Sequence, residues 1–206
     1  MAKRSMIVVM SLMIIFTSGC AKIIPEAEQL IQQVDLPIIH DVEEYLYQQG
    51  LDPNEVRIRT EIVARAAIWV GLRVPYLATN DPETGYRRDC SGFVSYAWDL
   101  RDSNGNPISP DTISLGNTFP DISLGSIQPG DIINNKKKGD IGHVVLFVSW
   151  IGNDQTKFIA FEENGGYGKA VQTELTIEYL NDSFTISEYD SIAPGPYYVQ
   201  QPPNIP

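Results

Sequence analysis

Residues 139–164 read GDIGHVVLFVSWIGNDQTKFIAFEEN, and this stretch determines the class of fold that the sequence predicts. Positions 143–151 are almost continuously apolar, which is typical of a buried strand. Asn153 and Asp154 are turn formers, and the segment 157–162 that follows them predicts a second strand. The two strands are therefore expected to pair as an antiparallel hairpin.

Segments with helical spacing precede this hairpin, and shorter strand signals flank it. The predicted helices cover residues 40–49, 60–70 and 91–100. The flanking strands are predicted at residues 131–133 and 170–176. Helices that come first and strands that follow predict an α+β fold, with the N-terminal helices packed on an antiparallel β-sheet.

The composition fits one globular domain and excludes several classes of protein. The chain has 206 residues, of which 43% are hydrophobic, and a formal net charge of −11. That charge argues against a protein that wraps nucleic acid, because phosphate binding needs a basic surface. Two cysteines and two histidines are too few for a disulfide-rich scaffold or a four-ligand zinc site.

The first twenty residues predict an export signal rather than part of the fold. A short basic segment precedes the apolar run 6–16, whose helical length of roughly 16 Å is about half of a membrane's hydrocarbon core. Thr17-Ser18-Gly19-Cys20 resembles a bacterial lipobox, although Thr17 stands where that pattern usually has Leu, Val or Ile. The resemblance implies a lipoprotein signal peptide over residues 1–19 and a lipid on Cys20. The alternative is an ordinary secretory signal with an incidental Cys.

Three further segments follow this signal. Residues 20–57 are predicted to be a lipid-anchored tether with a leader helix, and residues 58–193 to be the core domain. Residues 194–206 contain five prolines and predict an extended tail.

Cys90 lies where a predicted loop becomes a helix, in the sequence Asp89-Cys90-Ser91-Gly92-Phe93-Val94. If Cys20 carries a lipid, Cys90 has no disulfide partner in the chain, and a lone thiol in an exported protein is a candidate nucleophile. The free N–H groups and the positive dipole at a helix start favour a thiolate and can bind an oxyanion. Gly92 is expected to let a substrate approach the backbone. The alternative is a buried structural Cys.

A thiolate nucleophile needs a base that also protonates the leaving group, and histidine usually serves. His40 lies in the leader helix, before the core domain, and is interpreted as a surface or packing residue. His143 follows Gly142 at the start of the long apolar strand, where a side chain is presented at a rim. His143 is therefore the predicted base, and the alternative is a structural histidine.

The base also needs a partner that accepts a hydrogen bond from its second nitrogen. The second strand of the hairpin ends in Phe161-Glu162-Glu163-Asn164 and can return beside His143. Because side chains alternate along a strand, Glu162 and Asn164 share one face and Glu163 lies on the other. Glu162 is the predicted partner with Asn164 as helper, and a register shifted by one would substitute Glu163. For either acid, the alternative is a solvated surface charge.

Two basic clusters lie beside these residues in an otherwise acidic chain. Arg87 and Arg88 precede Cys90, and three lysines at 136–138 precede His143. We expect these clusters to attract a carboxylate of the substrate, most strongly at low ionic strength. The alternative is solvated loop charge.

Three motifs in this order resemble the NlpC-like and CHAP cysteine peptidases and amidases. The motifs are residues 89–94, residues 127–132 (Ile-Gln-Pro-Gly-Asp-Ile) and Gly142-His143-Val144. The resemblance covers residues 58–180 and implies a papain-like core that cuts peptide or amide bonds in bacterial peptidoglycan. It also implies that Cys90 is the nucleophile and His143 the base, and that residues 58–193 are the catalytic domain.

The resemblance implies roles for further polar residues. The third polar residue varies among these proteins, and Glu162-Glu163-Asn164 is closer to the Glu-x-Asn pattern of CHAP members. Asp131, in the Pro-Gly-Asp turn, is implied to be structural. Tyr76 is implied to border the oxyanion site, although Leu77-Ala78-Thr79 follows it where family members often have a Gly-Gly pair. The predicted substrate-binding residues are Tyr76, Arg88, Ser91 and Gly92.

Together these features predict an exported, lipid-anchored cysteine hydrolase of the bacterial cell envelope, at the outer membrane or the cell surface. It is expected to cleave bonds in peptidoglycan stem peptides through a thioester, and to need no metal and no organic cofactor. Two alternatives stay open. One is a catalytically silent lipoprotein that binds peptidoglycan, and the other is a papain-like amidase or acyltransferase that acts on a different substrate.

Overall fold

The computed structural model describes residues 37–205. The predicted signal peptide, Cys20 and residues 20–36 of the predicted tether lie outside the described residues. The helices are α2 (Pro37–Gln48), α3 (Pro53–Leu72), α4 (Cys90–Ala97) and α5 (Thr112–Thr118), with 3₁₀ turns η1 (Leu124–Ser126), η2 (Gly139–Ile141) and η3 (Ser187–Tyr189). Within this part of the chain, no helix is long and apolar enough to span a membrane.

All three predicted helices are present, with boundaries that differ by several residues. Helix α3 begins at Pro53, because proline suits the first helical position and Asp52 caps the helix by accepting a hydrogen bond from the N–H of Asn54 at 2.8 Å. It ends where Arg73 adopts a left-handed conformation with φ of 52°. The predicted domain boundary before residue 58 is therefore wrong, because it falls inside a continuous helix.

The strands form a curled antiparallel sheet of seven strands and a separate pair. The order in the large sheet is β3-β9-β4-β5-β6-β7-β8, and β1 pairs with β2. The strands are β1 (Leu77–Asn80), β2 (Arg87–Arg88), β3 (Asp121–Ile122), β4 (Ile132–Asn134), β5 (Val144–Ile151), β6 (Lys157–Asn164), β7 (Lys169–Leu180), β8 (Ser183–Ile186) and β9 (Tyr198–Gln200). The predicted hairpin is β5–β6, with Leu146 opposite Phe161. The sheet curls until Phe184 of β8 bridges to Tyr197.

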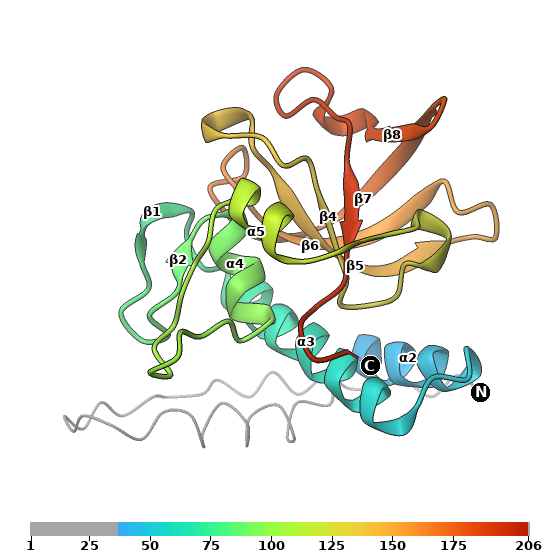
Figure 1. Ribbon diagram of the computed structural model, residues 1–206, viewed down its shortest axis with the longest axis horizontal. Coiled ribbons are helices and arrows are strands. Elements are labelled where there is room, and N and C mark those ends of the chain that lie inside the picture. Colours follow the sequence, from blue (N-terminus) through green and yellow to red (C-terminus); the bar gives the residue numbers. More distant parts are fainter. Residues whose placement is uncertain (1–36, 206) are drawn as a thin grey trace, which may run out of the picture.

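The large sheet has a buried core on each face. Helices α2, α3 and α4 lie together on one side of the strands (Figure 1), and their apolar side chains form one cluster with Val144, Leu146 and Phe161. A second cluster fills the inside of the curl and includes Val145 and Phe147. Because both faces are buried, β5 reads as a continuous apolar run. The predicted α+β fold, with helices on an antiparallel sheet, is confirmed.

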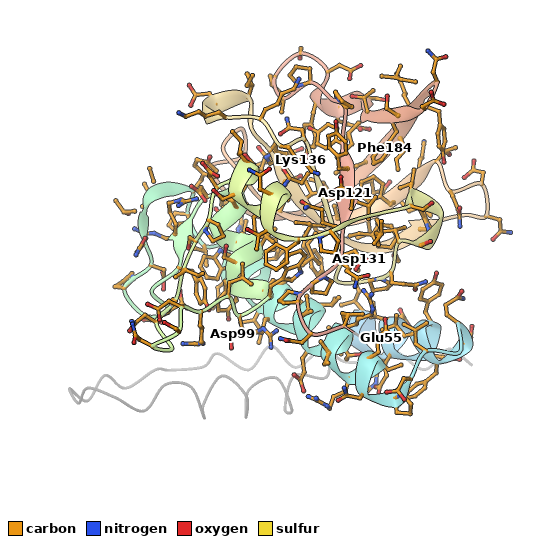
Figure 2. All side chains as sticks on the ribbon, in the orientation of Figure 1. Glu55, Asp99, Asp121, Asp131, Lys136 and Phe184 are labelled. Atoms are coloured by element: carbon orange, nitrogen blue, oxygen red, sulfur yellow. The ribbon has the colours of Figure 1, made fainter. Side chains whose placement is uncertain are left out.

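Asp131 ties helix α3 to the turn before β4 (Figure 2). Its buried carboxylate accepts a hydrogen bond from Arg59 Nη1 at 2.7 Å, and Arg59 Nε donates to Glu55 at 2.8 Å. Burial raises the pKa of Asp131 to about 6, while the charge and hydrogen bond of Arg59 oppose that rise. This contact holds helix and sheet together and leaves Asp131 no part in the chemistry of the site.

The C-terminal segment belongs to the sheet rather than to a separate tail. Strand β9 pairs with β3 on one side and β4 on the other, and two of its three residues are buried. The prolines flank this strand, so its own N–H groups are free to pair. Helix α2, assigned to the tether from sequence, also places Val42 and Leu46 in the first core cluster. The predicted tail over residues 194–206 is therefore wrong as a domain boundary.

Candidate active site

Cys90 is the first residue of helix α4. Asp89 caps the helix by accepting a hydrogen bond from the N–H of Gly92 at 2.8 Å. The Cys90 side chain is buried, and its Sγ lies 3.9 Å from the carbonyl oxygen of Gly142, the residue before His143. Within residues 37–205 Cys90 is a free cysteine at the junction of a loop and a helix, as the sequence predicts.

The two residues after Cys90 serve the fold. A Cβ on Gly92 would lie 1.9 Å from the carbonyl oxygen of Arg87, so the close approach of α4 to β2 requires glycine here. Ser91 is 3% exposed, and its Oγ accepts a hydrogen bond from Arg87 Nη2 at 2.6 Å. These contacts give Ser91 and Gly92 a structural role, and the prediction that they bind substrate stays a prediction.

A buried asparagine, Asn135, fixes the backbone of His143 at the start of β5. The N–H of His143 donates to Asn135 Oδ1 at 2.9 Å, and its carbonyl oxygen accepts from the N–H of Asn135 at 3.1 Å. Asn135 Nδ2 also donates to the carbonyl oxygen of Ile141 at 2.7 Å. These bonds hold the turn before β5 in the shape that presents the imidazole.

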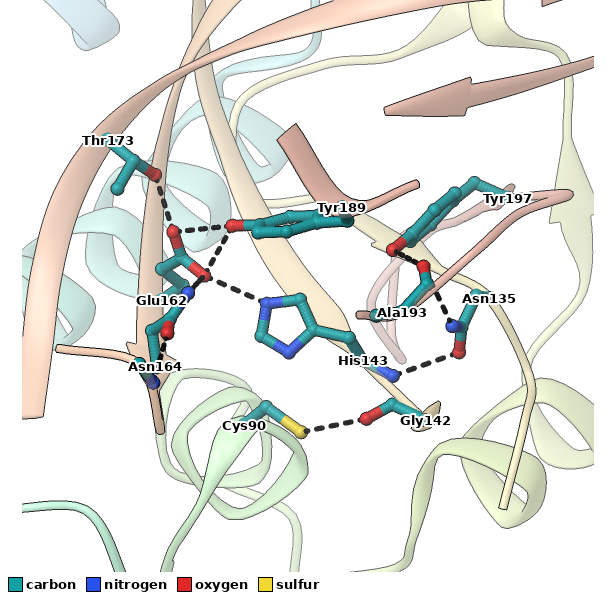
Figure 3. Close-up of polar contacts among 11 residues, drawn as sticks. Cys90, Asn135, Gly142, His143, Glu162, Asn164, Thr173, Tyr189, Ala193 and Tyr197 are labelled. Atoms are coloured by element: carbon teal, nitrogen blue, oxygen red, sulfur yellow. Dashed lines mark hydrogen bonds and ion pairs between the residues drawn. The ribbon is translucent and has the colours of Figure 1, made fainter. Parts of the chain in front are cut away.

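His143 lies between Cys90 and Glu162 (Figure 3). Its Nε2 is 2.8 Å from Glu162 Oε2, and the other ring nitrogen, Nδ1, is on the side of Cys90. Cys90 comes from α4 and Glu162 from β6, and His143 directly precedes β5. The fold thus brings together the residues predicted as nucleophile, base and orienting acid.

The buried Glu162 carboxylate receives hydrogen bonds from several elements. Besides His143, Asn164 Nδ2 donates at 2.9 Å and Thr173 Oγ1 at 2.7 Å. The hydroxyl of Tyr189 lies 2.7 Å from each carboxylate oxygen. Asn164 shares the face of Glu162, as the alternation of the strand predicts. Because these donors replace the lost hydration, an ionised carboxylate is stable in this buried place.

The pKa values of the pair shift in opposite directions. Burial alone would raise the pKa of Glu162, but the hydrogen bond and charge of His143, with the hydroxyls of Tyr189 and Thr173, hold it below its usual value. Burial alone would lower the pKa of His143, whereas hydrogen bonds and charges of Cys90 and Glu162 raise it to about 10. At neutral pH the proton therefore stays on the imidazole of His143, which carries a positive charge between Glu162 and Cys90.

Glu163 lies on the opposite face of β6 from His143. Its buried carboxylate accepts a hydrogen bond from Trp69 Nε1 of α3 at 2.7 Å, and its Oε1 has no partner among the described residues. Burial raises the pKa of Glu163 to about 7, and the hydrogen bond from Trp69 opposes that rise. The observed register therefore brings Glu162, and not Glu163, to His143.

Tyr76 reaches the site from the segment before β1. It lines a pocket together with His143, and its ring packs where a Cβ on Gly165 would meet it at 3.6 Å. Burial, reinforced by the charges of Cys90 and Asp89, raises the pKa of Tyr76 to about 12. Its hydroxyl therefore keeps its proton at neutral pH and remains a hydrogen-bond donor.

The pocket beside His143 has a volume of about 280 Å³. Its walls come from Tyr76, from the β6–β7 turn and from residues 189–193. Asp140, which is exposed, is the one residue of its lining that carries a permanent charge. The lining is otherwise neutral apart from the imidazole.

The predicted basic clusters do not line this pocket. Lys136 Nζ, whose place beside Asp121 is visible in Figure 2, binds both carboxylate oxygens of Asp121 at 2.6 and 2.7 Å. Lys137 Nζ donates to a backbone carbonyl oxygen in the segment before β9 at 2.9 Å, and Arg88 Nη2 donates to Thr79 Oγ1 at 2.8 Å. Each of these three side chains thus bonds within the fold and lies outside the pocket lining, and their attraction of a substrate carboxylate stays a prediction.

Three functional contacts were missed by the sequence analysis: those of Asn135, Thr173 and Tyr189. Thr173 left a signal, because it is a polar residue on the face of β7 that lies diagonally across from Glu162. Asn135 and Tyr189 lie in irregular segments, where no periodicity indicates the direction of a side chain. Their contacts follow only from the tertiary structure.

The site is arranged for acyl transfer to a thiol. A nucleophile, a base that contacts it and an acid that orients the base are the groups such chemistry needs. Within the part of the chain that the structure describes, no three His, Cys, Asp or Glu side chains are grouped to hold a metal ion. An α+β core that carries the nucleophile at a helix start, the base just before one strand and the acid on the neighbouring strand is typical of the papain-like cysteine hydrolases.

Comparison with known families narrows this class. The chain belongs to the NlpC/P60 family, whose model matches residues 73–192. Members of this family are cysteine peptidases and amidases that act on the bacterial cell wall, so the chain is a hydrolase of this kind. A search of the curated proteins found no match. The predicted resemblance to NlpC-like enzymes is confirmed.

Proposed function

We propose that this protein hydrolyses a peptide or amide bond in peptidoglycan stem peptides, with Cys90 as nucleophile, His143 as acid–base group and Glu162 as the residue that orients His143. One observation carries the proposal. The imidazole of His143 contacts a buried, fully hydrogen-bonded carboxylate with one nitrogen and faces the thiol with the other.

In the first half of the proposed reaction the substrate acylates Cys90. Nδ1 of His143 holds the proton of the Cys90–His143 pair while the sulfur of Cys90 bonds to the carbonyl carbon and the carbonyl oxygen becomes an oxyanion. The N–H of Cys90 donates to the oxyanion, and the hydroxyl of Tyr76 is a second donor. The N–H of Gly92 does not take part, because it is already bonded to Asp89. His143 then gives its proton to the leaving amine, the carbon–nitrogen bond breaks and a thioester remains.

In the second half, water hydrolyses the thioester. His143 takes a proton from the water as its oxygen bonds to the carbonyl carbon. The carbon–sulfur bond then breaks, a carboxylic acid is released, and His143 keeps the proton beside the sulfur of Cys90, which restores the starting state. Glu162 stays ionised throughout, holds the ring in place and stabilises its protonated form.

The charge of the pocket supports a substrate with an amino group near the scissile bond. Asp140 is the charged residue of the lining, and the lysines and arginine predicted to bind a carboxylate are engaged elsewhere. A diamino acid in a stem peptide, such as diaminopimelate next to a D-to-L linkage, offers such an amine. Because Asp140 is exposed, we expect its contribution to binding to be modest, about 1 kcal/mol or less.

The decisive experiment incubates the full-length protein, in detergent, with purified peptidoglycan. Wild type and the Cys90→Ala variant are compared for peptide fragments with new amino termini, and Glu174→Gln, on an exposed acid outside the pocket, serves as a control. Fragments that need the thiol support the proposal. Equal fragments from wild type and Cys90→Ala would contradict the mechanism.

A thiol-directed reagent separates the alternatives if no fragments form. Rapid alkylation of Cys90 at neutral pH that is lost in His143→Ala indicates an activated thiolate, and hence an amidase or acyltransferase with another substrate. Alkylation at the rate of a free peptide thiol indicates a catalytically silent binding protein. Either result overturns peptidoglycan hydrolysis.

Export and lipid attachment at Cys20 form a further part of the proposal, with the outer membrane or the cell surface as the expected location. The support is the basic segment, the short apolar run and the lipobox-like Thr17–Cys20. We expect the wild-type protein in the membrane fraction of a bacterial host and Cys20→Ser outside it. A variant that stays with the membrane would contradict the lipid anchor.

A further inference from the structure

Tyr189 contacts both members of the proposed His143–Glu162 pair (Figure 3). Its hydroxyl lies 2.7 Å from each oxygen of Glu162. Its ring packs edge-on against the imidazole of His143, with ring centroids 4.8 Å apart and an interplanar angle of 77°. The proposed mechanism gives this residue no role, although its side chain is buried at the centre of the site.

We propose that Tyr189 is a positioning residue that, through its hydrogen bonds to Glu162, sets how tightly the carboxylate holds the proton of His143. This inference rests on the proposed function, which gives the His143–Glu162 pair its catalytic role. The effect of Tyr189 on the proton affinity of His143 is a property of the folded protein and needs no substrate.

The two protonation states of the pair differ in how the buried charge of Glu162 is compensated. When His143 is protonated, the imidazolium compensates the buried charge of Glu162. When His143 is neutral, that charge depends on its remaining donors, of which the hydroxyl of Tyr189 is the one that touches both oxygens. The hydroxyl therefore stabilises the deprotonated state of His143 more than the protonated state, because a hydrogen bond counts most where a buried charge is otherwise uncompensated.

Tyr189 is built to act as a fixed donor. The carbonyl oxygen of Tyr189 accepts hydrogen bonds from the N–H groups of Ile192 and Ala193 at 3.0 and 2.8 Å, and Thr185 Oγ1 donates to the neighbouring Asp190 at 2.8 Å. Burial and the charge of Glu162 raise the pKa of Tyr189 far above its ordinary value. The phenol therefore keeps its proton over the whole range in which His143 titrates.

Other titratable groups near the pair come from several elements. Cys90 of α4 faces Nδ1 of His143, while Tyr76 and Asp140 line the pocket beside it. Burial, followed by the charge of Glu162, also raises the pKa of Tyr197, which lies before β9. Its hydroxyl donates to the carbonyl oxygen of Ala193 at 2.6 Å rather than to Glu162. Tyr197 is therefore a matched control, since it is a buried tyrosine of the same segment without the key hydrogen bond.

The test is an NMR titration of the imidazole protons in the full-length protein, with Tyr189→Phe and Tyr197→Phe as the paired variants. The chain has two histidines, so His40→Gln assigns the signals. A Cys90→Ser background removes the titration of the thiol. We expect Tyr189→Phe to raise the pKa of His143 by about 0.5 to 1, and Tyr197→Phe to leave it unchanged. An unchanged pKa in Tyr189→Phe, or equal changes in both variants, would overturn the proposal.

A second variant keeps the proposal testable if Tyr189→Phe does not fold. Incorporation of 3-fluorotyrosine at position 189 keeps the ring and makes the phenol a stronger donor, so the pKa of His143 should fall. A rise, or no change, contradicts the proposal. Because these titrations need no substrate, an inactive wild type would overturn the proposed function and still leave the role of Tyr189 to be decided by the NMR result.

Discussion

The two faces of strand β6 place adjacent glutamates in opposite states. Glu162 points into the curl of the sheet, where His143, Asn164, Thr173 and Tyr189 all donate to it. Glu163 points toward helix α3, where Trp69 donates a hydrogen bond to one of its oxygens and the other oxygen has no partner among the described residues. The first carboxylate has a lowered pKa and the second a raised one.

The difference shows that burial alone does not decide the charge of a carboxylate. Both side chains are inaccessible to solvent and sit one residue apart on the same strand. What separates them is the number of donors that replace water, together with the positive charge of a protonated His143. Glu162 is thus equipped to stay ionised, and Glu163 binds a proton near neutral pH.

The largest expected effect comes from Glu162→Gln, for which Glu163→Gln is the matched control. Glu162→Gln should lower kcat/KM on a stem peptide by about 10²- to 10⁴-fold, because the amide removes the charge that stabilises the imidazolium and disturbs the orientation of the ring. Glu163→Gln should leave kcat/KM near wild type. Equal losses in both variants would mean that the two faces do not differ in function.

The pH dependence sharpens the comparison next. Because burial is outweighed by Cys90 and Glu162, the pKa of His143 is raised, and its ion pair persists below that value and is lost as pH rises through about 10. Because the pKa of Glu162 is lowered, this carboxylate stays ionised down to acid pH, and its contribution to the ion pair is lost only below the usual carboxyl range. We expect the alkaline limb of the kcat profile near pH 10 in wild type and closer to 6.5 in Glu162→Gln. A limb that stays in place would refute the ion pair.

On the other face of β6, substitution of Glu163 should change the stability of the protein. The raised pKa of Glu163 means that the folded chain binds its proton more tightly than the unfolded chain, so stability falls as pH rises from about 4.5 through 7. Glu163→Gln keeps an acceptor for Trp69 and removes this titration. We expect it to stabilise the protein at pH 8 by about 1–3 kcal/mol and to have little effect at pH 4.5, measured by denaturant unfolding. If the free energy of unfolding of Glu163→Gln differs from that of wild type by the same amount at pH 8 and at pH 4.5, this assignment is contradicted.

The smallest expected effect is the loss of one donor to Glu162. Thr173→Val should lower kcat/KM by about 3- to 10-fold, because one hydrogen bond of several is removed. Thr176→Val, in the same strand and on its opposite face, should have no such effect. Equal activities of the two variants would show that the remaining donors suffice.

The hairpin and the proposed triad were predictable because both rest on local periodicity. The apolar run 143–151 and the alternation after residue 157 are sufficient to place Glu162 and Asn164 on one face. The order of the three motifs then identifies Cys90 and His143 as nucleophile and base. Motif order and the alternation of side chains along a strand can both be seen directly in the sequence.

What the sequence analysis missed depends on contacts between distant segments. Gly92 was assigned to substrate because a glycine near a nucleophile indicates a close approach, and the approach that the structure shows is that of Arg87 of the chain itself. The lysines at 136 and 137 bond to partners that no spacing reveals. Tyr189 enters the site from a 3₁₀ turn, and strand β9 is only three residues long between prolines. In each case the partner is chosen by tertiary packing.

Strand β9 also has a consequence for the order in which the chain folds. The β5–β6 hairpin closes a short turn and can form early, because its contacts are local. Strand β9 must instead bring Val199 beside both Ile122 and Ile133, which closes two long loops for three residues of pairing. Until that step is complete, β3 has no neighbour and β4 has an open edge, and unpaired edges invite association between chains. We therefore expect β9 to pair late in the closure of the sheet, and its loss to favour aggregation over folding.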